Sequence, residues 1–224
     1  MDSIYLEYKS KKGDIVTYGS MIENKQSIIE KGQIKSNITK IQFVMSQETT
    51  DVDSSGIATV DVTIKSGVVI SGEQSVPLPN TGQKITMKMK KNGEIIYTSV
   101  PVDFSQPSFP EGAKKKKDIW TSISKINIKG KSEPLELNYR YILWDISKYK
   151  GMDSAEIKVS CPETSSEIQE GVNQKISATG STLFDYVRGK LIKSEVETNT
   201  TVEVPQNDLV VKTRVSVKLE LIKN

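Results

Sequence analysis

Few side chains in this 224-residue chain could carry catalytic chemistry, and the residue types that it lacks exclude several kinds of catalytic and metal site. The sequence contains no His and a single Cys, Cys161. Ser-His-Asp and Cys-His nucleophile systems, metal sites built on His and an internal disulfide are therefore excluded. Without His, acid–base catalysis would need paired carboxylates or a Lys, and no convincing constellation of them stands out. We predict a protein that is not an enzyme and that uses neither a metal nor a cofactor.

The single thiol and two similarly placed aspartates are better explained by structural roles. Cys161 shares one face of an alternating segment with Ala155 and Ile157, and no basic residue is placed to lower its pKa. The sequence therefore predicts a buried, unreactive thiol. Asp14 and Asp118 precede two similar segments and lack neighbouring carboxylates at the spacing of a cation site. We expect them to cap turns.

Aromatic side chains are the best candidates for contacting a ligand. Trp120, Tyr139, Tyr141 and Trp144 cluster in one stretch of the second half of the chain. Trp and Tyr combine an apolar ring with a polar atom, which suits both a hydrophobic core and the lining of a ligand groove. Both interpretations stay open at this point. If a groove exists, these four residues are predicted to line it.

The balance of charges argues against a nucleic-acid reader. The chain has 28 Lys but only 3 Arg, and its 28 acidic residues leave a net charge of +3. Base readout and bidentate phosphate recognition depend on Arg. The one dense basic run, residues 114–117, could meet phosphates or anionic lipid, but a solvated turn before a strand is the favoured interpretation. No stretch approaches the ~18 apolar residues of a membrane-spanning helix.

Composition and alternation predict an all-β fold. The 25 Ile and 20 Val, against 10 Leu and 4 Ala, favour strands because β-branched side chains fit a pleated surface. Apolar and polar residues alternate over 58–65, 85–90 and 211–221, as in antiparallel strands with one buried face. Asn92-Gly93 predicts a hairpin with positive φ at both residues. Long strands indicate a large curved antiparallel sheet or half-open barrel of about 10 to 12 strands.

Three short matches in the same order predict an internal duplication. The matching segments are 11–17 with 115–121, 58–63 with 155–160, and 93–96 with 189–192. A half-sheet with one apolar face needs a second copy to bury that face. We predict a first half over residues 1–102, a connecting segment over 103–117 and a second half over 118–224, which together form one structural unit.

The second half resembles a family of uncharacterised exported bacterial β-proteins. The residues that carry the resemblance are Phe109-Pro110-Glu111-Gly112, Asp118-Ile119-Trp120-Thr121, Tyr139-Arg140-Tyr141-Ile142-Leu143, the stretch 149–157, and the stretch 184–191. One departure is Lys117, where the pattern has a Gly. More distantly, the series is similar to the open half-barrels of bacterial lipoprotein carriers, whose concave face holds acyl chains. The resemblance implies secretion or lipoprotein anchoring and no established activity.

These observations predict a non-catalytic protein of the cell envelope. We expect it to bind an apolar ligand, such as a lipid, or a protein partner on the curved sheet. The alternative is a structural or adaptor protein with a filled core and no small-molecule ligand. An exported, periplasmic or lipid-anchored location follows from the resemblance alone, and a cytoplasmic location stays open.

Overall fold

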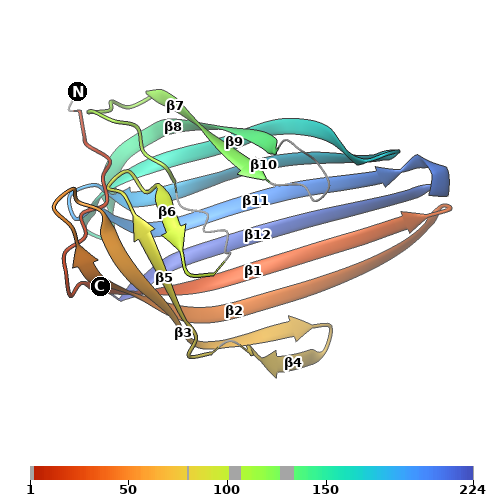
Figure 1. Cartoon of the computed structure of the whole chain (residues 1–224), viewed down its shortest axis with the longest axis horizontal. Coiled ribbons are helices and arrows are strands. Elements are labelled where there is room, and N and C mark those ends of the chain that lie inside the picture. Colours follow the sequence, from red (N-terminus) through yellow and green to blue (C-terminus); the bar gives the residue numbers. More distant parts are fainter. Residues whose placement is uncertain (1–2, 80, 101–106, 127–133, 224) are drawn as a thin grey trace.

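Strands dominate the computed structural model, which describes residues 3–79, 81–100, 107–126 and 134–223 (Figure 1). The strands are β1 (Ile15–Glu30), β2 (Gln33–Val52), β3 (Ala58–Ser71), β4 (Gln74–Pro77), β5 (Lys84–Met89), β6 (Ile95–Thr98), β7 (Ile119–Ile126), β8 (Leu135–Tyr149), β9 (Met152–Gln169), β10 (Val172–Asp185), β11 (Lys190–Val204) and β12 (Leu209–Lys223). A 3-10 turn, Pro205–Asn207, separates the last two. The predicted all-β fold with long strands is confirmed.

All twelve strands belong to one antiparallel sheet, in which the first strand, β1, pairs with the last, β12. Its order is β6-β5-β3-β2-β1-β12-β11-β10-β9-β8-β7, and β4 pairs with β3 beside this path. The first and last strands pair from Thr17 opposite Lys223 to Glu30 opposite Leu209. The outermost strands of this path, β6 and β7, do not pair with each other in the described part of the chain. The sheet is therefore curved and half-open, as predicted.

Alternation gives the sheet an inner and an outer face of different chemistry. We call inner the face that carries the buried side chains of Tyr18, Met45, Val60 and Ile157. Ion pairs join neighbouring strands across the outer face: Glu23 with Lys40, Glu195 with Lys218, and Glu197 with Arg214. Apolar side chains thus gather on one side of the sheet and charges on the other.

The segment before β1 covers one end of the inner face. Ile4 and Tyr8 are buried, and the backbone of Ile4 makes two hydrogen bonds, of 2.9 and 2.7 Å, with that of Lys114. The ring of Tyr8 contacts those of Phe109 and Phe184, with centroids 5.3 and 5.1 Å away. This aromatic cluster fixes the covering segment on the sheet and closes that end.

The turns that precede β1 and β7 have the same hydrogen bonds. The amide of Asp14 donates to the carbonyl of Lys11 at 3.0 Å, and the amide of Asp118 donates to the carbonyl of Lys115 at 3.0 Å. The Asp118 carboxylate also accepts a hydrogen bond from the Lys115 amide at 2.9 Å, so its predicted capping role is confirmed. The turns lie at matching positions of the two predicted halves.

The bulges and ion pairs near these two turns also correspond between the two predicted halves. The register of β2 against β3 shifts between Thr49 and Asp51, and that of β8 against β9 shifts between Leu143 and Asp145. The two aspartates form the corresponding ion pairs: Lys12 with Asp51 at 3.5 Å and Lys116 with Asp145 at 2.6 Å. These correspondences support the predicted duplication, which stays a proposal. Part of the predicted connecting segment, residues 103–106, lies outside the described residues.

The predicted hairpin at Asn92-Gly93 is present between β5 and β6, but its turn differs from the prediction. Of the two residues only Gly93 has a positive φ, of 87°. The amide of Lys90 donates to the carbonyl of Glu94 at 2.9 Å, which makes a three-residue loop with one left-handed residue. A Cβ at Gly93 would lie 2.7 Å from the ring of Tyr8, so glycine also makes room for the covering segment.

Candidate functional site

A cavity of about 390 Å³ opens on the inner face, between the covering segment and strands of both halves. Its walls come from β1, β2, β3, β5, β11 and β12. The apolar residues of the lining are Val16, Tyr18, Ile22, Phe43, Met45, Val60, Val62, Ile64, Ile85, Met89, Leu191, Val196, Val217 and Leu219. A mainly apolar concavity of this size is typical of a small-molecule site.

Two small residues help to leave this space open. Ser20 and Ser194 line the cavity from β1 and β11, and Ser20 pairs with Phe43 on one side and Leu219 on the other. Large side chains flank a position that carries only a hydroxymethyl group, so the inner face is hollow there. Ser194 bonds to Thr182 through the two hydroxyls at 3.1 Å, which satisfies its polar atom within the protein. The small residues at these two strand positions therefore help to form the cavity.

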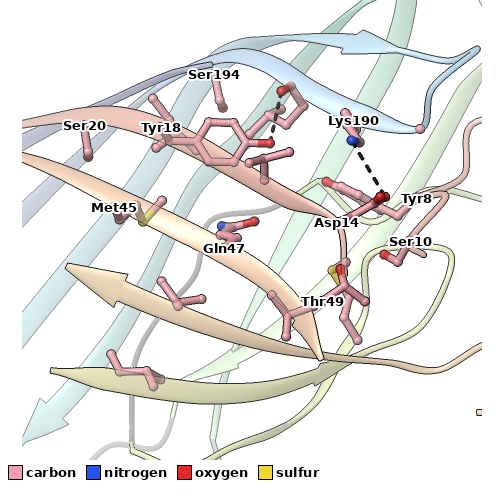
Figure 2. Close-up of a pocket in the computed structure, with 18 of the residues that line it drawn as sticks. Tyr8, Ser10, Asp14, Tyr18, Ser20, Met45, Gln47, Thr49, Lys190 and Ser194 are labelled. Atoms are coloured by element: carbon pink, nitrogen blue, oxygen red, sulfur yellow. Dashed lines mark hydrogen bonds and ion pairs between the residues drawn. The ribbon is translucent and has the colours of Figure 1, made fainter. Parts of the chain in front are cut away.

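One end of the cavity is polar. Figure 2 shows Tyr8, Asp14 and Lys190 together at this end, and Ser20 and Ser194 at the other. The ammonium of Lys190 lies 3.8 Å from the carboxylate of Asp14, and both side chains are partly buried. Asp14, which lies in the turn before β1, thus forms an ion pair at this end of the cavity, and its turn-capping role stays a prediction. Its partner comes from β11, at the opposite end of the sequence.

Two tyrosines reach this cavity with different hydrogen-bonding states. The hydroxyl of Tyr18 donates to the carbonyl of Leu191 at 3.2 Å (Figure 2). The hydroxyl of Tyr8 is buried and has no hydrogen-bond partner among the residues that the structure describes. Burial raises the pKa of both phenols above the ordinary value for tyrosine, because the charged form is poorly solvated there. Both hydroxyls therefore stay protonated and can donate at neutral pH.

None of the four predicted aromatic site residues lines this cavity. Trp120 and Tyr141 are buried in the core beneath the covering segment, where their rings stack with centroids 5.5 Å apart. The indole of Trp120 donates to the carbonyl of Ser108 at 2.9 Å. Tyr139 packs against the same core. This placement favours the core interpretation for these three, and their role in ligand binding stays a prediction.

Trp144 lies apart from the other three. It occupies the bulge of β8 between Leu143 and Asp145 and is 38% exposed. The ammonium groups of Lys117 and Lys158 lie 3.2 and 3.4 Å from the centroid of its ring. This side chain holds two lysines on the protein surface.

The thiol prediction is confirmed. Cys161 is 2% exposed on the inner face of β9, and burial raises the pKa of its thiol. Among the described residues, no three acidic or Cys side chains gather where a metal ion could be held. The described chain also has no helix with the length and apolar character to cross a membrane.

The sequence did not single out the polar end of the cavity. A signal for Tyr8 exists in the alternation of Ile4, Leu6 and Tyr8 near the N-terminus, since all three are buried. Nothing local marks Lys190 as a partner of Asp14, because 176 positions separate them. Only the pairing of β1 with β12, and of β12 with β11, brings them together.

Comparisons with known proteins give no family. No family description and no curated protein matches the chain. Among solved structures, DynF from the dynemicin biosynthesis pathway of Micromonospora chersina is similar over 98% of this chain and 85% of its own, with 8% identity and a TM-score of 0.26. A putative outer membrane lipoprotein-sorting protein domain from Vibrio parahaemolyticus matches over 91% of this chain and 85% of its own, with 9% identity and a TM-score of 0.17. A DUF1329 family protein from Desulfovibrio piger matches over the same shares, with 12% identity and a TM-score of 0.16. TM-scores this low carry no argument about this chain.

Proposed function

We propose that the protein binds an apolar small molecule, such as a lipid, in the cavity of the inner face, and that it does so without catalysis. The observation that carries the proposal is the composition of the lining. Apart from the polar end and a few uncharged polar residues (Ser20, Gln47, Thr49 and Ser194), the cavity walls are aliphatic, aromatic and Met side chains. Burial of an apolar ligand against such walls is favourable by about 25 cal/mol per Å² of surface removed from water.

Along β11 and β12 the inner face continues past the cavity without a charged side chain. Along β11 and β12 it carries Ser194, Val196, Thr198, Thr200 and Val202, opposite Leu219, Val217, Val215, Thr213 and Val211. Charged residues of the same strands lie on the outer face, where they pair with one another. An apolar chain longer than the cavity could therefore follow the sheet.

The rival proposal is a structural or adaptor protein with a filled interior. The cavity of about 390 Å³ weighs against a filled interior and favours ligand binding. A protein partner on the outer face is compatible with either role. A location in the cell envelope rests on the sequence resemblance alone, and fractionation of cells that express the full gene product tests it.

A pair of Ser-to-Phe substitutions tests the ligand proposal. Ser20→Phe fills the cavity, whereas Ser216→Phe places the same side chain on the outer face of β12, between Glu23 and Glu197. We expect the wild-type chain and S216F to bind a fluorescent apolar probe, N-phenyl-1-naphthylamine, and S20F to lose that binding. Thermal unfolding of each variant checks that it folds. The proposal is wrong if the folded wild-type protein binds no apolar probe, or if S20F binds it as wild type does.

A further inference from the structure

We propose that β7 is an interface through which two copies of this chain pair, strand against strand, so that their sheets continue into one another. β7 lies at one margin of the sheet, beside β8 (Figure 1). About half of the backbone N–H and C=O groups of an edge strand point away from its neighbour and can pair with a further strand. No residue of β7 lines the cavity, so this inference goes beyond the proposed function and does not depend on it.

The matching strand of the first half already has a neighbour on each side. β1 follows the turn that corresponds to the turn before β7, and it pairs with β2 on one side and with β12 on the other. β7 pairs with β8, and no other strand of the described chain pairs with it. A further antiparallel strand beside β7 would therefore complete the arrangement that β1 has.

β7 lacks the features that usually protect an edge strand from pairing, which are short length, charges, prolines and bulges. The other outermost strand, β6, has four residues, whereas β7 has eight. From Ile119 to Ser124 the sequence has neither a charged residue nor a Pro. The pairing of β7 with β8 also runs without a register shift. The edge of β7 is thus regular and uncharged over most of its length.

The outer face of β7 is apolar. Ile119 and Ile123 are 51% and 58% exposed. Both point away from the inner face, because they alternate with Trp120, whose ring lies in the core. Ile142 of β8 lies opposite Ile119. A single exposed Ile is ordinary, but three neighbouring isoleucines at a free edge form a surface that a paired strand would cover.

The sequence of β7 favours a second copy of the same chain as the partner. In an antiparallel pair centred on Thr121, the two Thr121 side chains lie opposite each other, and Ile119 of each copy lies opposite Ile123 of the other. Directly opposite residues point to the same face, so the apolar outer faces join. The threonine hydroxyls can bond to each other across the pair. No other antiparallel register of β7 with itself brings these two isoleucines opposite each other.

The nearest cations lie beyond this central pairing and have partners within the chain. In the register centred on Thr121, Lys117 of one copy faces Lys125 of the other. The ammonium of Lys117 lies 3.2 Å from the centroid of the Trp144 ring, and Lys125 pairs with Glu136 at 2.9 Å. These contacts compensate part of each charge, and the interface is limited to residues 119–123. So small an interface should give a dimer that dissociates on dilution.

Sedimentation velocity of the full chain tests the dimer. We expect mostly dimer at about 200 µM and monomer at about 2 µM, because association follows mass action. Ile123→Lys places a charge opposite Ile119 and should weaken the dimer at least about tenfold. Ile34→Lys is the matched control, at a 66% exposed isoleucine of β2, which is paired on both sides, and it should dimerise as wild type does. Thermal unfolding checks that both variants fold.

A cysteine cross-link tests the register. Opposite Cα atoms of an antiparallel pair lie about 4.5–5.5 Å apart, within disulfide reach, so Thr121→Cys should form a cross-linked dimer under mild oxidation. Ser124→Cys is the control, because the two copies of residue 124 would lie roughly 20 Å apart along the strands. The native thiol, Cys161, is 2% exposed and should not react.

Three results would overturn the proposal. The first is a wild-type chain that stays monomeric at the high concentration, which would leave the edge of β7 to an extended segment of another protein. The second is I123K dimerising as tightly as wild type. The third is S124C cross-linking as readily as T121C, which would show contact without this register. Probe binding by wild type and S20F tests the ligand proposal separately.

Discussion

Lys117 adopts the left-handed backbone conformation that Gly13 adopts in the matching turn of the first half. Their φ values are 77° and 88°. The amide of Gly13 donates to the carbonyl of Thr49 at 2.8 Å, and that of Lys117 donates to the carbonyl of Leu143 at 2.7 Å. The turn geometry is thus the same in both places, although the second turn has Lys117 at a positive φ that glycine adopts without steric cost.

Gly13→Ala should destabilise the protein by about 1 kcal/mol, the approximate cost of a left-handed conformation for a residue with a side chain. No atom lies within 4 Å of the added Cβ, so the backbone conformation is the whole cost. Urea unfolding measures the change. Lys117→Gly, made in a Trp144→Leu background to remove the ring contact, should stabilise by a similar amount. Equal stability of Gly13→Ala and wild type would contradict the strain argument.

Gly189→Ala should be more damaging than Gly151→Ala. Both glycines have positive φ, but a Cβ at Gly189 would lie 2.4 Å from the Lys9 amide and 2.6 Å from the Glu7 carbonyl, whereas Gly151 has open space. We expect about 1 kcal/mol for Gly151→Ala and about 1–3 kcal/mol more for Gly189→Ala, since overpacking adds to the backbone cost. Differential hydrogen exchange should show residues 3–10 loosened only in the second variant. Equal effects would mean that the covering segment shifts without cost.

Asp61→Asn should lower stability in a pH-dependent way. The Asp61 carboxylate accepts hydrogen bonds from Thr86 at 2.7 Å and from Lys84 at 3.0 Å, and these lower its pKa. A lowered folded-state pKa stabilises above the unfolded-state pKa, about 3.9, and that contribution is lost as pH falls through the folded-state value. We expect D61N to cost about 1.5 kcal/mol at pH 7 and clearly less at pH 3. The measurement is urea unfolding at both pH values.

The control for Asp61 is Asp208→Asn, at an exposed residue in a left-handed conformation that Asn also accepts. It should leave stability nearly unchanged at either pH. If D61N shows the same deficit at pH 3 as at pH 7, the stabilising role of the Asp61 charge is refuted.

Trp144→Leu should cost about 1–2 kcal/mol although the ring is partly exposed. The ammonium groups of Lys117 and Lys158 both lie over it, and each cation–π contact at such a site contributes about 0.5–1 kcal/mol. A double-mutant cycle with Lys158→Met isolates one of the two contacts by urea unfolding. Strict additivity of the two substitutions would show that this contact contributes nothing.

Strands were predictable because their signal is local. The alternation of Val211, Val215 and Leu219 with charged neighbours indicates one face to the interior and one to water, and β12 has that arrangement. The side chains of this predicted buried face nevertheless remain half-buried. Alternation says which way a side chain points and does not say whether another segment covers it.

The sequence by itself determined the all-β class, the strand directions of the main elements and the burial of Cys161, because each depends on the order of apolar and polar residues along one strand. Tertiary structure alone decided which part of the inner face is filled and which is hollow. The covering segment packs with Tyr8, together with Phe109, over Trp120 and Tyr141, which the sequence predicted as ligand contacts. It leaves the cavity beside Ser20 unfilled. That choice depends on contacts between residues more than 100 positions apart, which no local pattern encodes.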